Sequence, residues 1–403
     1  MVRKKTVVLG NGRPVVDLFY SPITSDGLFF LITASNDAKS KLINGESGDC
    51  IRTFEGHRDA VWSRCLDSNA SHAATASADY SAKVWNASTG QELYSFEHED
   101  IVRSCAFSEL EPHLLLTGCE KKLRVFDLNR PETPRVEIDQ YSFGRVRTVA
   151  WLQNGYNILS SSTERNHVRI WDIRAGHYTL KTLQTTSPGM SVEVSRDGGY
   201  ITTANGSAVS FWDANGFGLV KSYTKNYNVV SDSLEPTSAK RFIAGGEDVC
   251  VRIFDFEEGK EIECNNHIGA VHCVRFSSGG ESYASGSDDG NGTIMLWEMD
   301  PVRHRDEADA LDSDGMEADA RDSDAPDSDS FEADAHDSDC SEADANDSDG
   351  FEDSDCVEAD VHDSNAHDCD GLEADAHDSD DEDNGRNKMG SWIFCKLGAC
   401  SVL

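Results

Sequence analysis

Two groups of residues in the sequence combine a histidine, a hydroxyl, an aspartate and a tryptophan in the same order. The first group is His57, Thr75, Asp79 and Trp85, and the second is His267, Ser285, Asp289 and Trp297. Imidazole, hydroxyl and carboxylate groups can transfer protons, but they also form buried hydrogen-bonded networks. Because the pattern occurs twice, with Asn291-Gly292 inserted in the second copy, we interpret both groups as structural networks that fix a repeat.

Motifs typical of enzymes and of secreted proteins are missing from the sequence. No glycine-rich phosphate loop leads from a strand into a helix, and no Cys or His spacing is typical of a zinc site. The 12 cysteines are scattered, and no apolar run has the length of a secretory signal or a membrane-spanning helix. We therefore expect a non-enzymatic protein of the cytoplasm and nucleus, without cofactor or metal.

The tryptophans belong to a long repeat that positions these groups. Bulky anchor residues follow one another at intervals of 42, 41, 45, 41, 42 and 43 residues. These anchors are Ile43, Trp85, Phe126, Trp171, Trp212, Phe254 and Trp297. Such a period, with short apolar runs in each unit, is the signature of WD40 repeats, which form four-stranded blades. The sequence predicts an all-β, seven-bladed WD40 propeller over residues 1–300, closed by residues 5–10 as the outer strand of the last blade.

Residues at the start of the innermost strands are the candidates for partner binding at the top face of this propeller. They are Trp62, Arg103, Arg147 and His272, with Arg58 nearby. Tryptophan and arginine are frequent in protein hot spots, and tryptophan can also stack on single-stranded RNA. The alternative is that Trp62 packs between blades and the arginines lie in solvent. Residues 1–300 carry a net charge of −9, which disfavours broad nucleic-acid binding and leaves RNA binding indirect or local.

Most of the negative charge lies after the propeller. Residues 301–385 contain 34 Asp and Glu against three Arg, a net charge of −31 of the total −37. This segment repeats the pattern EADAxDSD, as at Glu332 and Glu373. Such a composition lacks core-forming residues and repels itself, so we expect a disordered acidic tail that acts as a spacer.

The last residues, 386–403, form a short segment in which the charge reverses. The chain ends on Cys400-Ser-Val-Leu403, which fits a C-a-a-X box for prenylation, and Cys395 is a candidate for palmitoylation. We expect membrane association only if Cys400 is prenylated. The alternative is that this apolar segment folds back onto the propeller.

Several longer stretches resemble the serine-threonine kinase receptor-associated proteins, also called unr-interacting proteins. They are RPVVDLFYSPIT (13–24), SGDCIRTFEGHRDAVW (47–62), AATASADYSAKVWNASTGQEL (73–93), GGEDVCVRIFDFEEGKEIE (245–263) and HCVRFSSGGESYASGSDDG (272–290). The resemblance implies a non-enzymatic scaffold of the survival-of-motor-neuron complex, which loads Sm proteins on spliceosomal RNA for mRNA splicing, with Gemin-type partners. It also implies an adaptor at transforming-growth-factor-β receptor kinases. The alternative is the WD-repeat subunit i of translation-initiation factor three, which shares the propeller layout.

Overall fold

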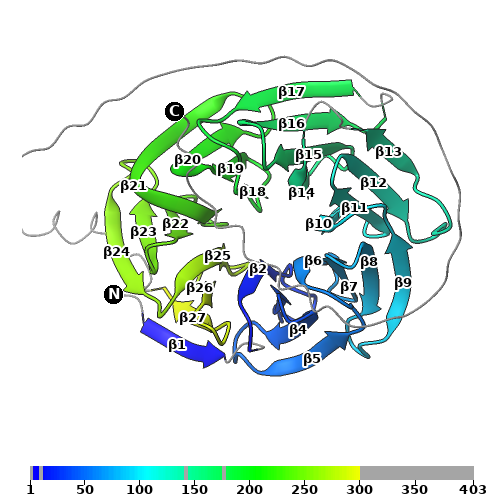
Figure 1. Ribbon diagram of the computed structural model, residues 1–403. Coiled ribbons are helices and arrows are strands. Elements are labelled where there is room, and N and C mark those ends of the chain that lie inside the picture. Colours follow the sequence, from blue (N-terminus) through cyan, green and yellow to red (C-terminus); the bar gives the residue numbers. More distant parts are fainter. Residues whose placement is uncertain (1–2, 9–11, 140–143, 175–177, 300–403) are drawn as a thin grey trace, which may run out of the picture. The chain divides into compact units, whose positions relative to one another are not determined.

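The computed structural model describes residues 3–8, 12–139, 144–174 and 178–299. Within these residues the regular elements are all β-strands, and they pair into antiparallel sheets. Figure 1 shows the sheets arranged around a central opening. The all-β WD40 propeller predicted from the repeat is therefore confirmed.

Four sheets follow one another along the first half of the chain, and each has four strands in sequence order. The first contains β2 (Val15–Tyr20), β3 (Phe30–Ser35), β4 (Lys39–Asn44) and β5 (Cys50–Glu55). The second contains β6 (Val61–Leu66), β7 (His72–Ser77), β8 (Ser81–Asn86) and β9 (Glu92–Glu97). The third contains β10 (Val102–Phe107), β11 (Leu114–Cys119), β12 (Lys122–Asp127) and β13 (Val136–Asp139). The fourth contains β14 (Val146–Trp151), β15 (Asn157–Ser162), β16 (His167–Asp172) and β17 (Tyr178–Gln184).

The next sheet has seven strands, because one long strand serves two repeat units. It contains β18 (Ser191–Val194), β19 (Tyr200–Ala204), β20 (Gly206–Asp213), β21 (Leu219–Leu234), β22 (Arg241–Gly246), β23 (Cys250–Asp255) and β24 (Glu261–Asn266). The first part of β21 pairs with β20 and its last part, from Val229, pairs with β22. The pairing thus gives six sheets among the described residues, instead of the seven separate sheets that the sequence predicts. The stretch Lys225–Asn228 contains no glycine or proline that would end the strand.

The last sheet joins the two ends of the repeat region. It contains β25 (Ala270–Phe276), β26 (Ser282–Asp288), β27 (Ile294–Glu298) and, on the outside, β1 (Arg3–Val8). Strand β1 pairs antiparallel with β27 from Arg3 opposite Glu298 to Val8 opposite Ile294. The predicted closure by the N-terminal run is confirmed, although the strand begins at residue 3 rather than residue 5. Pairing of this kind covers a sheet edge that would otherwise be open.

The turn before the outer strand has the same chemistry in successive sheets. In the β8–β9 turn, the Asn86 side-chain oxygen accepts hydrogen bonds from the backbone N–H groups of Ser88 (3.0 Å) and Thr89 (2.9 Å). Gly90 follows with a φ of +78°, which glycine adopts without strain. The β4–β5 turn repeats the arrangement at Asn44 and Gly48. These local signals fix the hairpins and hence the register of each sheet.

The apolar cores lie between neighbouring sheets, and they hold the inner strands side by side. One core joins Ala74, Val84 and Cys65 of the second sheet to Val102 and Leu115 of the third. The inner strands contact one another in the order β2, β6, β10, β14, β18, β21, β25 and back to β2. Residues at equivalent positions of these strands are consequently neighbours around the channel, and this is how the fold positions the candidate site.

Small residues allow the sheets to approach closely. A Cβ atom on Gly118 of β11 would lie 2.6 Å from Val146 Cγ1 and 2.8 Å from Val149 Cγ1 of β14. Gly245 of β22 has the same relation to β25, where Val271 Cγ1 would lie 2.6 Å away. Contacts this short do not occur between real carbon atoms, so the packing requires glycine at both positions.

Candidate functional site

The first predicted group forms a continuous hydrogen-bonded chain in the second sheet. Trp85 Nε1 donates to Thr75 Oγ1 at 2.8 Å, and Thr75 Oγ1 lies 2.7 Å from His57 Nε2. His57 Nδ1 lies 2.8 Å from Asp79 Oδ2. Because the Thr75 hydroxyl accepts from the indole, its own proton can go to His57 Nε2, and Nδ1–H then donates to Asp79. The chain ties the turn before β6 to strands β7 and β8.

Asp79 is held as a carboxylate by several donors. Burial raises its pKa, but hydrogen bonds from His57, from the Ser81 hydroxyl (2.7 Å) and from the Arg58 backbone N–H (2.9 Å) outweigh burial and hold the pKa well below its ordinary value. A carboxylate with this many donors is a poor general base. The geometry fits a network that stabilises the turn.

The second predicted group repeats these contacts at its hydroxyl, with one more donor from the turn at its aspartate. Trp297 Nε1 donates to Ser285 Oγ at 2.7 Å, and His267 Nε2 lies 2.6 Å from the same oxygen. Asp289 accepts hydrogen bonds from the backbone N–H groups of Asn291 and Thr293, both at 3.0 Å, and from the Thr293 hydroxyl. Ser81, at the position equivalent to Thr293, likewise donates its backbone N–H and hydroxyl to Asp79. The insertion therefore adds only the Asn291 N–H as a donor.

Related pairs occur in other sheets, where the sequence reasoning did not assign them. Trp171 Nε1 donates to Ser160 Oγ at 2.9 Å, and Trp212 Nε1 donates to Thr203 Oγ1 at 3.2 Å. His98 Nε2 lies 2.9 Å from Thr117 Oγ1. A hydroxyl about ten residues before each anchor is the signal that could have found these pairs.

The predicted docking residues lie at the start of the inner strands. Trp62, Arg103 and Arg147 occupy the second position of β6, β10 and β14, which are successive neighbours around the channel. The Arg103 guanidinium carbon lies 5.6 Å from the centre of the Trp62 ring. Arg147 Nε donates to the Met190 carbonyl at 3.0 Å. The structure brings these three residues together, and we call them the channel mouth.

The other two predicted docking residues have different surroundings. His272 is on β25, and its Nε2 lies 3.7 Å from Asp288 Oδ2. Arg58 is exposed, and its backbone N–H donates to Asp79. Neither contact involves the three residues of the channel mouth.

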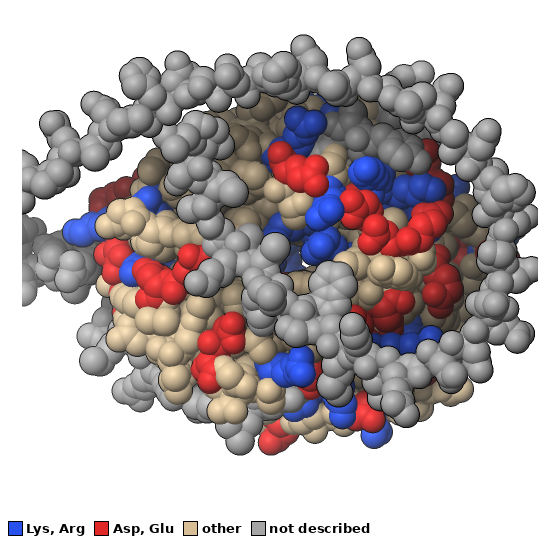
Figure 2. Space-filling view, in the orientation of Figure 1, with Lys and Arg blue, Asp and Glu red and all other residues tan. Residues whose placement is uncertain are grey.

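Positive charge at the channel mouth is only partly balanced. Burial and the neighbouring Arg145 lower the pKa of Arg103, and burial together with Arg103 lowers the pKa of Arg147. Arg145 pairs with Glu120 at 2.9 Å. No Asp or Glu of the described residues pairs in this way with Arg103 or Arg147. Figure 2 shows Lys and Arg side chains gathered around the central opening, with acidic side chains beside them.

Deeper in the channel the charges are paired, and the sequence reasoning did not predict them. Arg64 Nη2 lies 2.6 Å from Asp17 Oδ1. Arg275 Nη1 donates to the Asp232 carbonyl at 3.1 Å, and Arg275 Nε lies 3.8 Å from Glu193 Oε1. Burial and the nearby Glu193 raise the pKa of the Asp232 carboxyl to about 7. No sequence signal predicts these pairs, because they depend on which inner strands become neighbours.

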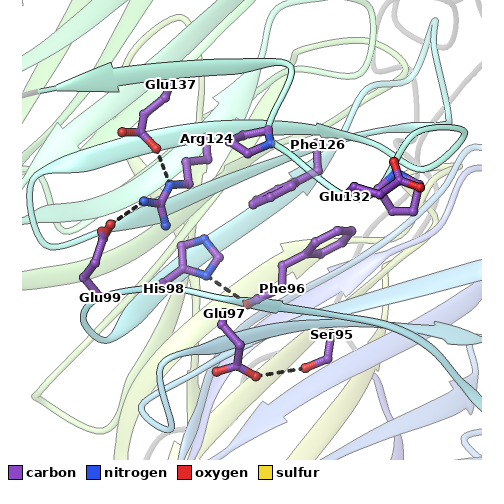
Figure 3. Close-up of a pocket in the computed structure, with 11 residues that line it drawn as sticks. Ser95, Phe96, Glu97, His98, Glu99, Arg124, Phe126, Glu132 and Glu137 are labelled. Atoms are coloured by element: carbon purple, nitrogen blue, oxygen red, sulfur yellow. Dashed lines mark hydrogen bonds and ion pairs between the residues drawn. The ribbon is translucent and has the colours of Figure 1, made fainter.

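A separate groove of about 540 Å³ lies between β9 and the β12–β13 hairpin (Figure 3). Its floor contains Phe96 and Phe126, whose rings are stacked with centres 4.1 Å apart. Arg124 is bound by Glu99 and Glu137, each at 2.7 Å. The positive charge of Arg124 is therefore balanced within the groove, and the groove lies where the second and third sheets meet.

His98 in this groove is not suited to acid–base catalysis. Burial lowers its pKa to about 4. Both ring nitrogens have partners, because Nδ1 lies 3.0 Å from the Phe96 carbonyl oxygen and Nε2 contacts Thr117. Over the described part of the chain, no group of three or more His, Cys, Asp or Glu side chains could hold a metal ion. No helix long and apolar enough to cross a membrane is found in that same part.

Some predicted features lie outside the described residues. They are the acidic tail at 301–385, the segment 386–403, and the two cysteines Cys395 and Cys400. The predictions of disorder, lipidation and membrane association for these positions stay predictions.

The ring of antiparallel sheets and the repeated tryptophan–hydroxyl pairs define a WD-repeat propeller. The family model "WD domain, G-beta repeat" matches residues 48–86, 90–127, 135–172 and 260–298. Within this class, the chain belongs to the serine-threonine kinase receptor-associated protein family, as the sequence resemblance indicated. It is 43% identical over 297 residues to the member from Dictyostelium discoideum, covering 73% of this chain and 99% of that relative.

Two further comparisons show the range of the similarity. The serine-threonine kinase receptor-associated protein of Homo sapiens is 40% identical over 294 residues, which are 72% of this chain and 81% of the relative. Eukaryotic translation initiation factor 3 subunit I of Danio rerio is 23% identical over 314 residues, covering 71% of this chain and 94% of the relative. The second similarity is much weaker, so it supports a common propeller fold more than a common role.

Proposed function

We propose that this protein is a non-enzymatic, seven-bladed WD40 scaffold that binds protein partners at its channel mouth. By its family, we place it in the survival-of-motor-neuron complex, in the assembly of spliceosomal ribonucleoproteins, with a further adaptor role at receptor kinases. Its place of action is then the cytoplasm and nucleus. Family membership at 40–43% identity supports this placement.

The contact between Trp62 and Arg103 is the observation that carries the docking proposal. Trp62 is half-buried on the inner strand β6, and Arg103 lies against its ring. The Trp62 Nε1 atom is buried and has no hydrogen-bond partner among the described residues. Buried donors normally have a partner. An indole and a guanidinium at a rigid channel opening provide the large, partly polar contact area typical of binding hot spots.

Affinity purification of the tagged full-length chain from eukaryotic cells, followed by mass spectrometry, tests the proposal. We expect Sm or Gemin-type proteins with the parent chain and their loss with Trp62→Ala. Leu219→Ala is the matched control, because Leu219 is 55% exposed at the start of β21, in the part that pairs with β20, and its truncation also removes an apolar side chain. Equal recovery with Trp62→Ala and parent would exclude the channel mouth as the docking site.

The same experiment separates the alternative role in translation initiation. The distant similarity to subunit I of initiation factor 3 predicts recovery of initiation-factor subunits. If these subunits are recovered without Sm or Gemin-type proteins, the ribonucleoprotein assignment is wrong.

A further inference from the structure

We infer that the channel mouth recognises acidic side chains, so that the docking partner presents Asp or Glu carboxylates to Arg103 and Arg147. This inference rests on the proposed docking function and specifies the chemistry of the partner. The proposed ligand is a linear acidic peptide segment and not a nucleic acid.

The first argument is the missing counter-charge. Arg103 and Arg147 are both half-buried, and neither forms an ion pair with an Asp or Glu of the described residues. Glu120 and Asp100 act on Arg103, and Asp17 acts on Arg147, only from a longer distance. Partly buried charges normally have an opposite charge nearby, because desolvation without a partner is costly. Arg145 shows the normal situation, since Glu120 binds it at 2.9 Å. The two guanidiniums have no carboxylate in contact with them among the described residues, and they therefore favour a bound anion.

The second argument is the geometry of the two strands. Arg103 and Arg147 occupy the same position on β10 and β14, which are neighbours in the ring. The repulsion that contributes to lowering the pKa of Arg147 comes from Arg103, so the two charges are close. The bond from Arg147 Nε to the Met190 carbonyl fixes one edge of that guanidinium. A guanidinium with a free edge binds a carboxylate through two parallel hydrogen bonds.

The third argument concerns Trp62, which is next to Arg103. Its ring offers an apolar surface beside the cations, so a peptide can place a methylene chain or an apolar side chain there. Its unpartnered Nε1–H provides one further donor near the anion. Arg103, Arg147 and Trp62 carry only donors, so they complement a carboxylate, which only accepts hydrogen bonds.

Charge further out favours a peptide over RNA. Glu120 and Glu164 lie on Arg145 at the edge of the mouth, and residues 1–300 carry a net charge of −9. A phosphate backbone has a negative charge on every nucleotide, and these carboxylates would repel it. A peptide whose one or two acidic side chains stand between neutral residues would not be repelled in this way.

The test uses residues 1–315, which form one compact unit. The matched 297 residues of the Dictyostelium discoideum relative are 99% of its length, so a member of this family folds without a long tail. The probe is a fluorescein-labelled short peptide in which one glutamate on each side of a leucine stands between neutral residues, and the control peptide has glutamines instead. Fluorescence anisotropy measures both affinities. We expect the glutamate peptide to bind about tenfold or more tightly than the glutamine peptide, as charge-assisted hydrogen bonds require.

Variants then locate the binding. Arg103→Gln should remove this preference. Arg103→Lys should retain part of it, because lysine keeps the positive charge but cannot form the two parallel hydrogen bonds of a guanidinium. The double variant Arg130→Gln/Arg135→Gln loses two exposed arginines elsewhere on the surface and should bind like the parent. Thermal unfolding of each variant shows whether it is folded, and Arg103→Lys keeps the test valid if Arg103→Gln is not.

Three results would overturn the inference. They are equal affinity for both peptides, undetectable binding of both, and parent-like binding by Arg103→Gln. Competition by a single-stranded oligouridine at lower concentration than the peptide would assign the mouth to RNA instead. If Trp62→Ala still loses its cellular partners in any of these cases, the docking proposal survives and only the chemistry of the partner is wrong.

Discussion

At the scale of single residues, the same four side-chain types form closely similar networks in the two predicted groups. In each group the histidine Nε2 and the tryptophan Nε1 lie on one hydroxyl oxygen, and the aspartate accepts from its own turn. The sequence could predict which residues meet near each tryptophan, because a repeat keeps their spacing. It could not predict that Asn291 donates its backbone N–H to Asp289, because the insertion lies outside the repeat pattern.

Replacing His57 should weaken the fold. In His57→Ala, the buried carboxylate of Asp79 loses its His57 contact and the Thr75 hydroxyl loses an acceptor, which should lower the free energy of unfolding by about 1–3 kcal/mol. Urea denaturation followed by circular dichroism measures the change. His113→Ala is the control, because His113 lies in a turn and is 37% exposed. If both variants unfold at the parent's midpoint, the network does not stabilise the second sheet.

At the scale of elements, sequence reasoning finds the strands that are defined by local patterns of apolar residues and turns. The N-terminal strand β1 was predicted on β27 because a ring leaves no other open edge. Strand β21 was not predicted as one 16-residue element, because period and turn signals describe each unit separately. The charge pairs between inner strands were also missed. They form between strands that are distant in the sequence, such as Arg275 on β25 and Glu193 on β18.

The close approach of neighbouring sheets predicts the effect of a single methyl group. Gly118→Ala would place Cβ 2.6 Å from Val146 Cγ1, so β11 and β14 must separate, at a cost of about 1–3 kcal/mol. Gly218→Ala is the matched control, because nothing lies within 4 Å of a Cβ at that position. Thermal unfolding of the two variants compares them. Equal unfolding temperatures would contradict the packing described between these strands.

The buried carboxyl of Asp232 on β21 predicts a dependence of stability on pH. Its pKa is 3.8 in an unfolded chain and about 7 in the fold, raised first by burial and then by Glu193 on β18, with Arg275 on β25 acting in the opposite direction. A raised pKa means that the folded state binds the proton more tightly. Its stabilising contribution is therefore complete below pH 4 and is lost as the pH rises through 7.

Substitution by asparagine should remove this dependence. Asp232→Asn should gain stability relative to the parent between pH 5 and pH 8, by at least about 1 kcal/mol. Urea denaturation of both proteins at the two pH values measures this difference. Asp139→Asn, at an exposed position, should show no such gain. A constant difference between Asp232→Asn and parent at both pH values would show that Asp232 does not titrate in this range.

At the scale of the whole molecule, charge is distributed very unevenly along the chain. Residues 1–300 carry −9, and residues 301–385 carry −31. The channel mouth is positive within this acidic protein, because Arg103 and Arg147 lack acidic partners among the described residues. A covalently attached acidic segment is present at a high effective concentration near every site that it can reach. We therefore predict that the acidic tail competes with any acidic partner of the mouth.

Removal of the tail should tighten binding at low salt. We expect residues 1–315 to bind the glutamate peptide severalfold more tightly than the full chain at about 10 mM ionic strength, where charges act over about 30 Å. The difference should disappear near 1 M, where this range falls to about 3 Å. Arg103→Gln, made in both lengths, is the control. Its two forms should bind the peptide with equal affinity, because the cation for which the tail and the peptide compete is gone. Equal affinity of the two parent forms at every salt concentration would leave the acidic tail as a spacer that does not compete for the channel mouth.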